Sequence, residues 1–382
     1  MSEVYIAGVG ITPAGEHWER SLRELAFAAL EAAANDTERL LGGRAPAEAL
    51  FAANALAGQL SGQAHLGVLI ADFAGLRGIE AVNVEAAGAS GGAAIRQAYI
   101  AVASGQVETA LVVGVEKTTD TIGGRVNAAT ATAGDSDFES VQGATPAALA
   151  GLLMQRYLHT YGLEHDVFAD FAINAHANAK ANPNAMFRNT ITRDAYARAG
   201  AVADPISMMD VAPECDGAAA IVLTARPTAV RVIASAQATD TLALHDRPDL
   251  LGFDAAQLSA GRAYKTANLG PDEIDLFELF DAYTVFAALS LEAAGFAERG
   301  QGWRLAVEGQ IGRDRRIPIQ TFGGLKARGN PIGATGVYQV AEVALQVRGE
   351  AGASQVPNAR VGMAQCIGGI GANIVTHILQ TA

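Results

Sequence analysis

EAVNVEAAGASGGAAIRQAYIAVASG, residues 80–105, is the stretch of sequence that decides the fold. Its pattern predicts a strand over residues 80–86, a tight glycine-rich turn over 87–92 and a helix over 93–105. A second strand, residues 109–115, follows directly. Strands that alternate with helices across short glycine turns are typical of an α/β fold whose strands are mostly buried.

The same alternation continues on both sides of this stretch. Ser21 is expected to cap a helix that runs to about Ala34, because Glu24 stands at the capping-box spacing. The second half of the chain repeats the first in outline, without a proline- or serine-rich linker, so we expect two similar halves packed into one body, residues 1–225 and 226–382. The other predicted elements are strands at 4–10, 48–56, 218–225, 230–238 and 371–379, a helix at 65–73, and a strand–loop–helix unit at 275–294.

The alternation breaks between residues 118 and 205. This part of the chain holds polar turns, a predicted helix around residues 146–161 and the asparagine-rich run INAHANAKANPNAMFRN, residues 173–189. Such a segment is typical of surface loops that contact ligands rather than of a core. We therefore expect an inserted loop domain at about 118–205, within the first half.

The composition excludes several classes of function. The 382 residues include 27 Lys and Arg against 40 Asp and Glu, a net charge of −13, so no general positive field is available to bind nucleic acid or an anionic membrane. No apolar run reaches the length of about 18 residues that a membrane-spanning helix needs. The N-terminus lacks the features of a signal peptide, so a cytoplasmic location is expected.

Two cysteines and seven histidines bound the chemistry further. Two cysteines, Cys215 and Cys366, exclude a disulfide framework and any cysteine-rich metal site. The histidines are scattered without the spacing of metal ligands, so no metal site is predicted.

Six separated segments, in the same order along the chain, resemble the thiolase superfamily, in particular the sterol-carrier-protein-type thiolases. They are VYIAGVG (4–10), NVEAAGASGGAA (83–94), the loop-domain run MQRYLHTYG…INAHANAKANPNAMFRN (154–189), PECDGAAAIVL (213–223), ELFDAYT (278–284), and the pair GGLKARGNPIGATG (323–336) with CIGGIGANIV (366–375). The resemblance implies a thiolase fold: two similar βαβαβαββ halves in a five-layer αβαβα body with an inserted loop domain. It also implies a homodimer or homotetramer that acts on acyl-CoA, with a coenzyme A thioester as ligand and no covalently bound cofactor.

The residues at the positions that matter for catalysis depart from the family pattern. That pattern places a nucleophilic cysteine where this chain has Gly88, and histidines where it has Phe280 and Asn330. Only the acid/base cysteine has a counterpart, Cys366. Thiolysis needs a thiolate that takes the acyl group covalently, so this departure argues against an ordinary thiolase reaction.

The remaining groups suit the formation of an enolate. The resemblance implies that the backbone N–H groups of Gly88 and Gly368 form one oxyanion hole, and the side-chain amide of Asn330 can donate to the thioester oxygen. Cys366, with a lowered pKa, and Tyr283 are the expected proton carriers. These pieces fit an aldol or retro-aldol reaction, similar to that of thiolase-like aldolases that work with a DUF35-type OB-fold partner.

Two alternatives stay open: a catalytically silent subunit or scaffold that binds acyl-CoA, and an acetyl-CoA acetyltransferase-type enzyme that uses a substitute nucleophile. For substrate binding, Phe280 is expected in the acyl pocket. The polar side chains expected to meet the ligand or the phosphates of coenzyme A are His176, Arg188, Lys326 and Arg328.

Overall fold

A nine-stranded mixed sheet organises the molecule. The computed structural model describes residues 2–43, 45–121 and 124–382. The strand order is β3-β2-β4-β7-β1-β8-β11-β10-β9. The first five strands in this order come from the N-terminal half: β1 (Tyr5–Ile11), β2 (Ala49–Ala53), β3 (Glu80–Val84), β4 (Thr109–Glu116) and β7 (Gly217–Thr224). The other four come from the C-terminal half: β8 (Val230–Thr239), β9 (Leu276–Glu278), β10 (Val361–Gly368) and β11 (Asn373–Thr381).

The two groups of strands repeat one pattern. In the first, β2 runs parallel to β4, which pairs antiparallel with β7, and β7 pairs antiparallel with β1. In the second, β9, β10, β11 and β8 follow the same sequence of parallel and antiparallel pairs. A parallel bridge between Phe277 and Ile319 stands where the first half has the full strand β3. The groups meet at one register pair, Tyr5 with Arg231. Two similar halves are therefore confirmed, while the exact division after residue 225 stays a prediction.

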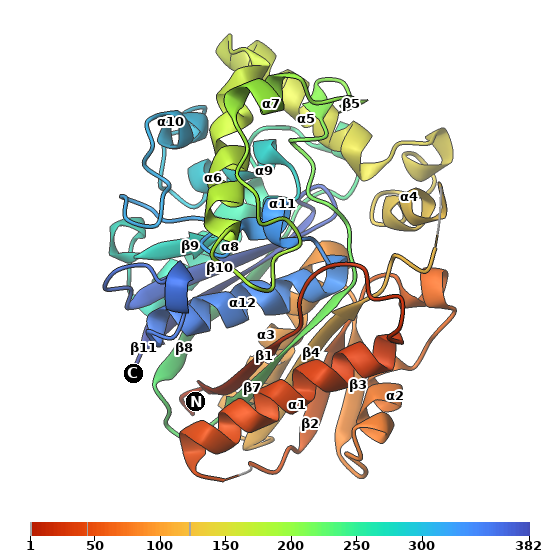
Figure 1. Ribbon diagram of the computed structural model, residues 1–382, viewed down its shortest axis with the longest axis vertical. Helices are drawn as coiled ribbons and strands as arrows, with labels where there is room; N and C mark the ends of the chain where they lie inside the picture. The colour runs from red at the N-terminus through yellow and green to blue at the C-terminus, as the bar shows by residue number, and fades with distance from the viewer. Residues whose placement is uncertain (1, 44, 122–123) are drawn as a thin grey trace.

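Helices complete five layers (Figure 1). One outer layer holds α1 (Leu22–Leu41) and α2 (Leu66–Phe73), which pack on strands of the first half. The opposite outer layer holds α8 (Asp254–Ala267), which packs on β8 and β11. Between the halves lie α3 (Ser90–Ala103) and α12 (Thr335–Val347), which contact each other and strands of both halves. The predicted α-β-α-β-α arrangement is thus confirmed.

The first helix is longer than expected. The Ser21 capping box is present, and Glu24 Oε2 accepts the Ser21 N–H at 2.7 Å. The helix continues past Ala34 to Leu41, since two polar residues that usually disfavour a helix have partners here. Asp36 accepts the Val9 N–H at 2.9 Å, and the Thr37 hydroxyl donates to the Ala33 carbonyl at 2.8 Å.

The insertion between β4 and β7 packs over the C-terminal half (Figure 1). Its aromatic residues Tyr157, Phe168 and Phe171 share one buried cluster with Phe277 and Phe286 of that half. The predicted helix at 146–161 is present as α5 (Pro146–Tyr161), capped by Thr145. The other elements of the insertion are α4 (Gly124–Ala131), α6 (Ala169–Ala179), α7 (Arg193–Ala197), β5 (Ala201–Ala203) and β6 (Ile206–Ser207); the facing elements are α9 (Thr284–Ala293), α10 (Gly302–Val307) and α11 (Gly324–Arg328).

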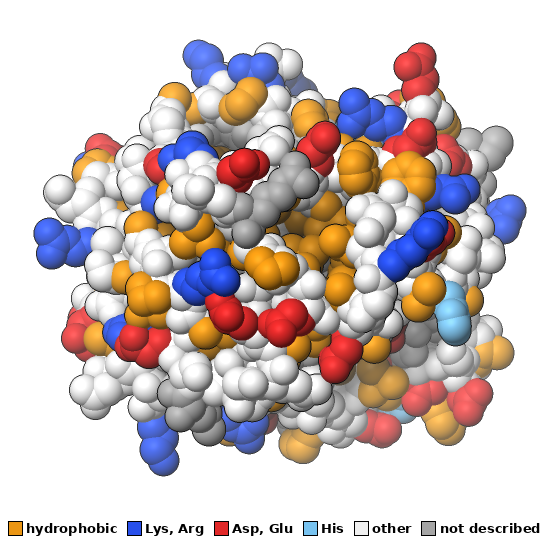
Figure 2. All heavy atoms as spheres, turned by 90° about the horizontal axis from the view of Figure 1, so that it is seen from below, with side chains coloured by type: hydrophobic (Ala, Val, Ile, Leu, Met, Phe, Trp, Pro, Cys, Tyr) orange, Lys and Arg blue, Asp and Glu red, His pale blue; other side chains and the backbone are white. Residues whose placement is uncertain are grey.

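The surface agrees with the charge balance of the sequence. On the face seen in Figure 2, basic side chains stand apart from one another between acidic, polar and apolar ones. Within residues 2–43, 45–121 and 124–382, none of the helices combines the length and the apolar character required to span a bilayer.

Candidate active site

One cavity of about 370 Å³ lies where both halves and the insertion meet. Its walls come from loops that follow strands of the two halves, from the end of α4 and from the start of α5. Four residues predicted for the site line it together: Gly88, Phe280, Tyr283 and Asn330. Further lining residues are Leu56, Glu85, Thr130, Thr132, Glu214, Phe286, Ile332, Ile367 and Gly369.

Gly88 sits in a single helical turn, η2 (Ala87–Ala89), that leads into α3. Two side chains shape this turn. Ser90 Oγ accepts the Ala86 N–H at 2.9 Å and donates to the Ala87 carbonyl at 2.6 Å, while Glu85 Oε1 accepts the Ala87 N–H at 2.6 Å. No acceptor among the described residues engages the Gly88 N–H. This N–H therefore remains a free donor at the N-terminal end of a helix, where negative charge is favoured.

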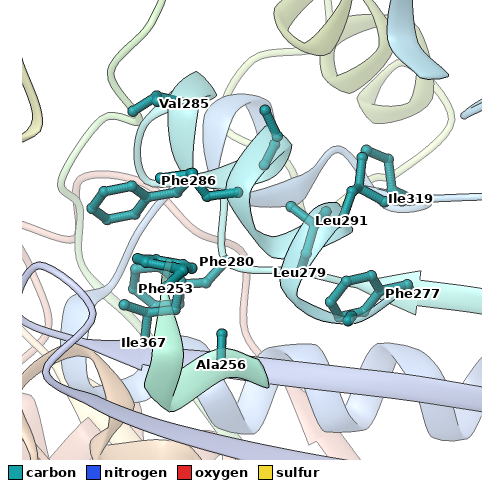
Figure 3. Close-up of a cluster of buried hydrophobic side chains, with 14 of the residues drawn as sticks. Phe253, Ala256, Phe277, Leu279, Phe280, Val285, Phe286, Leu291, Ile319 and Ile367 are labelled. Atoms are coloured by element: carbon teal, nitrogen blue, oxygen red, sulfur yellow. The ribbon is translucent and has the colours of Figure 1, made fainter. Parts of the chain in front are cut away.

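The space beside Gly88 is already occupied. A Cβ atom at this position would lie 2.5 Å from the Ile367 carbonyl oxygen and 2.8 Å from Cζ of Phe280. Figure 3 shows the Phe280 ring beside Phe253 and Ile367, with Phe286 close to them. An apolar wall thus stands where a side chain at position 88 would project, and the residue is held to glycine by packing.

Asn330 offers a free amide to the cavity. Its Oδ1 accepts the Thr335 hydroxyl at 2.8 Å, which fixes the amide plane, and its backbone N–H donates to the Pro213 carbonyl at 2.9 Å. Its Nδ2 has no hydrogen-bond partner in the part of the chain that the structure describes. The side chain is almost fully buried apart from this opening. The two amide hydrogens are therefore available to an oxygen atom of a ligand.

Glu214 is a carboxylate of the cavity that the sequence did not single out. The segment that carries it runs beside Asn330 as an isolated parallel bridge. Its side chain is exposed at the cavity, and partial desolvation by the surrounding protein raises the pKa of the carboxyl above its usual value. No hydrogen bond or ion pair to another described residue engages it. The thiol of its neighbour Cys215 is buried and does not line the cavity.

Tyr283 lies near Glu214 and packs on the aromatic wall. Its backbone pairs with Val211 in an antiparallel bridge, and its ring packs edge-on against Phe286 with centroids 5.2 Å apart. Burial, and then the Glu214 carboxylate, raise the pKa of the Tyr283 phenol. The hydroxyl is thus protonated near neutral pH and able to donate a proton or a hydrogen bond.

Cys366 and Gly368 do not line the cavity. The Cys366 side chain points into a small apolar cluster with Ala89, Ala93 and Val375, and burial raises the pKa of its thiol to about 12. A proton carrier would need the opposite shift. The structure therefore corrects the expectation for Cys366. The neighbours of Gly368, Ile367 and Gly369, reach the cavity in its place.

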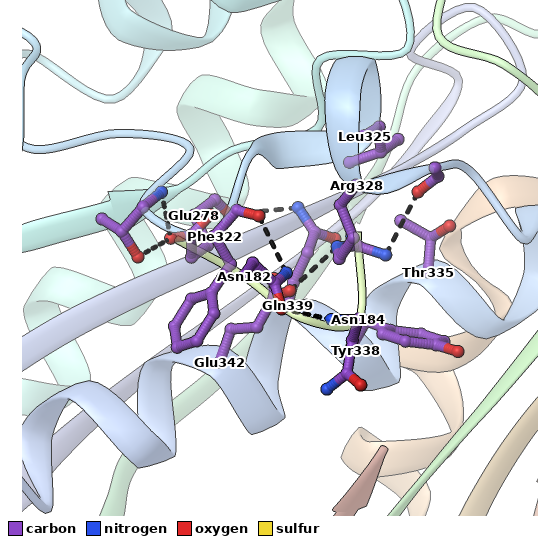
Figure 4. Close-up of polar contacts among 12 residues, drawn as sticks. Asn182, Asn184, Glu278, Phe322, Leu325, Arg328, Thr335, Tyr338, Gln339 and Glu342 are labelled. Carbon is purple, nitrogen blue, oxygen red and sulfur yellow. Dashed lines mark hydrogen bonds and ion pairs between the residues drawn. The ribbon is translucent and has the colours of Figure 1, made fainter. Parts of the chain in front are cut away.

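The two cations of the 323–336 segment are turned inward. Arg328 is fully buried, lies 2.9 Å from Glu342 and covers the Tyr338 ring at 4.7 Å (Figure 4). Lys326 is also buried, and its Nζ donates to the carbonyls of Met208 and Val211. Neither side chain is placed to meet a phosphate group of coenzyme A. The sequence suggested phosphate contacts because these basic residues stand beside a pocket motif. It does not reveal that the buried Glu342 carboxylate pairs with Arg328.

The two remaining predicted contacts lie on the insertion, away from the cavity wall. His176 is buried, its Nδ1 lies 2.9 Å from the Asn189 carbonyl, and its ring stacks on Phe187. Burial lowers the pKa of His176, so its ring is neutral near pH 7. Arg188 is exposed to solvent. Exposure leaves Arg188 free to meet a ligand outside the cavity, a role that stays a prediction.

The arrangement can hold and protonate a developing negative charge. One backbone donor, one amide donor, a carboxylate and a phenol line a cavity whose larger apolar side chains are Leu56, Phe280, Phe286, Ile332 and Ile367. Preorganised donors of this kind stabilise an oxyanion or enolate. Over the described ranges, no group of three or more metal-ligating side chains comes together.

Known proteins resemble the whole chain. The family described as "Thiolase, N-terminal domain" matches residues 4–227, and "Thiolase C-terminal domain-like" matches residues 236–381. An acetyl-CoA acetyltransferase of Methanothermobacter thermautotrophicus is 41% identical over 100% of both chains. The benzoylsuccinyl-CoA thiolase subunit BbsB of Thauera aromatica is 29% identical over 96% of this chain and 95% of its own.

A solved structure of the Ltp2–ChsH2(DUF35) aldolase has a TM-score of 0.86 at 23% identity. It covers 99% of this chain and 98% of its own, so it shares the fold.

Proposed function

The chain belongs to the thiolase family, and from that premise we propose that it binds an acyl-CoA thioester and makes or breaks the C–C bond next to the thioester carbonyl through an enolate. The observation that supports this most is the pairing of two free donors, Asn330 Nδ2 and the Gly88 N–H, in a cavity that neither cysteine lines. The acyl-CoA class is supported by the full-length acetyl-CoA acetyltransferase relative.

The proposed step needs no acyl-enzyme. With the thioester oxygen against Asn330 Nδ2, the electron pair released when the bond between the α- and β-carbons breaks moves onto that oxygen as an enolate. The amide stabilises this charge more than the neutral thioester, which is what accelerates a reaction. The apolar wall around Phe280 excludes water from the acyl group.

Acyl transfer is a second candidate, because the relative at 41% identity is named an acetyl-CoA acetyltransferase. It requires a nucleophile, and the hydroxyls of Thr130 and Thr132 that line the cavity already donate to backbone carbonyls. A silent subunit that binds acyl-CoA is the third. A DUF35-type partner protein is suggested by the Ltp2–ChsH2(DUF35) aldolase, and a homodimer or homotetramer stays a prediction.

A pair of assays separates these functions. The purified protein is incubated first with β-hydroxyacyl-CoA esters, with and without a DUF35-type partner, and release of an aldehyde or ketone is measured. It is then incubated with acetoacetyl-CoA and coenzyme A, and acetyl-CoA is measured. We expect carbonyl release in the first assay and none of the thiolysis product in the second. Robust thiolysis would refute the enolate proposal, and tight CoA-ester binding without turnover would favour the silent subunit.

Asn330 supplies the internal test. Asn330→Ala removes the amide donor, so we expect kcat to fall about 10²–10³-fold while the affinity for the CoA ester changes little. A loss of affinity for the CoA ester with kcat unchanged would mean that the amide only binds the substrate.

A further inference from the structure

We propose that Glu214 is the base and proton carrier of this cavity, an inference that rests on the proposed enolate chemistry. The proposal assigns the proton transfer to a residue outside the positions that the resemblance singled out. It starts from where the backbone places Glu214 and from what its carboxylate does not contact.

The backbone fixes Glu214 next to the enolate-holding amide. The Asn330 N–H donates to the Pro213 carbonyl at 2.9 Å, and the Cys215 N–H donates to the Asn330 carbonyl at 3.3 Å. These two bonds flank Glu214 on either side. On the other edge, the Ala212 N–H donates to the Ala282 carbonyl at 2.9 Å. The residue is thus held between the loop of Asn330 and the loop of Tyr283, on ordered backbone.

The carboxylate is uncommitted, unlike most acids in this region. The Asp216 side chain accepts bonds from Thr118, Thr119 and Lys117, and Asp281 accepts the Leu325 N–H and a bond from Gln320. Glu214 has no such partner within the described ranges, and its side chain is exposed at the cavity wall. A carboxylate left without a structural bond inside a ligand cavity is available to a reacting proton.

The charges that face Glu214 are few. The other titratable side chains of the cavity wall are Glu85, whose carboxylate is bound to the Ala87 N–H, and Tyr283. The cations of the neighbouring segment point elsewhere, because Lys326 is bound to two carbonyls and Arg328 to Glu342. Partial desolvation, with no cation bound to the carboxylate, raises the pKa of Glu214 above its usual value.

The proposed proton movement balances without a further reactant. In the cleavage direction, a Glu214 carboxylate oxygen takes the proton of the β-hydroxyl group. The O–H electron pair forms the new carbonyl, and the bond between the α- and β-carbons breaks. Its electron pair becomes the enolate on the thioester oxygen at Asn330. After the carbonyl product leaves, the protonated Glu214 returns the proton to the α-carbon, which restores a neutral thioester and a carboxylate.

If Glu214 gives a proton to the α-carbon, it can also remove one. We therefore expect hydrogen at the α-carbon of acetyl-CoA to exchange with deuterium from solvent even when no C–C bond is cleaved. We would incubate the wild-type protein with acetyl-CoA in D₂O and follow deuterium entry by mass spectrometry. The variants are Glu214→Gln, Glu214→Ala and Glu85→Gln. We expect exchange in the wild type, a loss of at least about 100-fold in Glu214→Gln with unchanged acetyl-CoA affinity, and recovery of exchange in Glu214→Ala when formate is added. Formate should not restore Glu214→Gln, since its side chain still fills the space.

The outcomes separate this inference from the proposed function. Exchange in the wild type that is equal in Glu214→Gln would overturn the role of Glu214 while leaving the enolate chemistry in place. Loss of exchange in Glu85→Gln alone would assign the proton to the other carboxylate and also overturn it. No exchange in the wild type, with or without a DUF35-type partner, would reject the proposed function itself. If Glu214 is the base, the rate of exchange rises with pH as its carboxyl group loses its proton. In Glu214→Ala with formate, this rise should occur at a different pH, because formate then accepts the proton.

Discussion

At the scale of single residues, Gly88 and Phe280 behave as one unit. The Phe280 ring and the Ile367 carbonyl occupy the space into which a side chain at position 88 would project. Gly88→Ala should therefore lower the free energy of unfolding by about 1–3 kcal/mol, through overpacking. Denaturant unfolding measures this change.

A double-mutant cycle with Phe280→Ala tests the stated cause. Removal of the ring relieves one of the two close contacts, so the combined loss should be smaller than the sum of the single losses by about 0.5 kcal/mol or more. Strict additivity would mean that the Ile367 carbonyl alone determines the cost.

Buried carboxylates also make the stability of the protein depend on pH. Burial raises the pKa of Glu278 from 4.5 to about 7, although Thr321 donates to its carboxylate. A raised acid pKa in the folded state means that the folded chain binds the proton more tightly than the unfolded chain, so stability is lost as pH rises from about 4.5 to 7. Glu278→Gln should remove a decline of roughly 3 kcal/mol over that window.

The measurement is urea unfolding at a series of pH values. Glu19→Gln, a change at an exposed glutamate, serves as the control and should follow the wild-type profile. A Glu278→Gln profile parallel to the wild type would contradict the assignment. Glu116 and Glu342, whose pKa values burial also raises, add to the decline and remain in the variant.

At the scale of elements, hydrogen bonds to Asp210 hold in place the segment 211–214, which leads to the cavity. The Asp210 carboxylate accepts bonds from Ser207, Tyr196 and Thr284 and lies 2.7 Å from His165. It thereby joins the insertion to the start of α9, directly before the residues that pair with Tyr283 and Asn330. The neighbouring side chains donate their hydrogen bonds to the Asp210 carboxylate. In Asp210→Asn, one carboxylate oxygen becomes an NH₂ group, which faces these donors and cannot accept their bonds.

We expect Asp210→Asn to cost roughly 3–5 kcal/mol of stability and to lower turnover as well, because the segment that positions Glu214 loosens. Thermal unfolding and the exchange assay measure the two effects. The nearby exposed Asp166→Asn should change stability by less than about 0.5 kcal/mol. If Asp210→Asn unfolds like the wild type, Asp210 does not fasten this segment.

At the scale of the whole molecule, glycines let the two central helices touch. A Cβ on Gly336 of α12 would lie 2.4 Å from the Gly92 nitrogen of α3 and 2.9 Å from Cys366 Sγ. Because these helices join the halves, Gly336→Ala should push the halves apart and cost at least about 1–3 kcal/mol. Gly261→Ala, in α8 with open space around it, should instead stabilise the protein by up to about 1 kcal/mol. Opposite signs in calorimetry would support this packing, and equal effects would oppose it.

Local sequence patterns were sufficient to predict the architecture. Periodicity, glycine turns and the Ser21 capping box indicated the elements and the two halves, because local propensity and burial pattern act over neighbouring residues. The sequence also brought Gly88, Phe280, Tyr283 and Asn330 to one site through their motifs.

Only the tertiary structure decided which way side chains face and what they meet. Cys366 turns into an apolar cluster and Arg328 pairs with Glu342, although both stand in motifs that suggested the site. Glu214 enters the cavity because its segment pairs with the distant Asn330 segment. Pairing between segments far apart in sequence, and the burial that shifts a pKa, depend on contacts that no local pattern encodes.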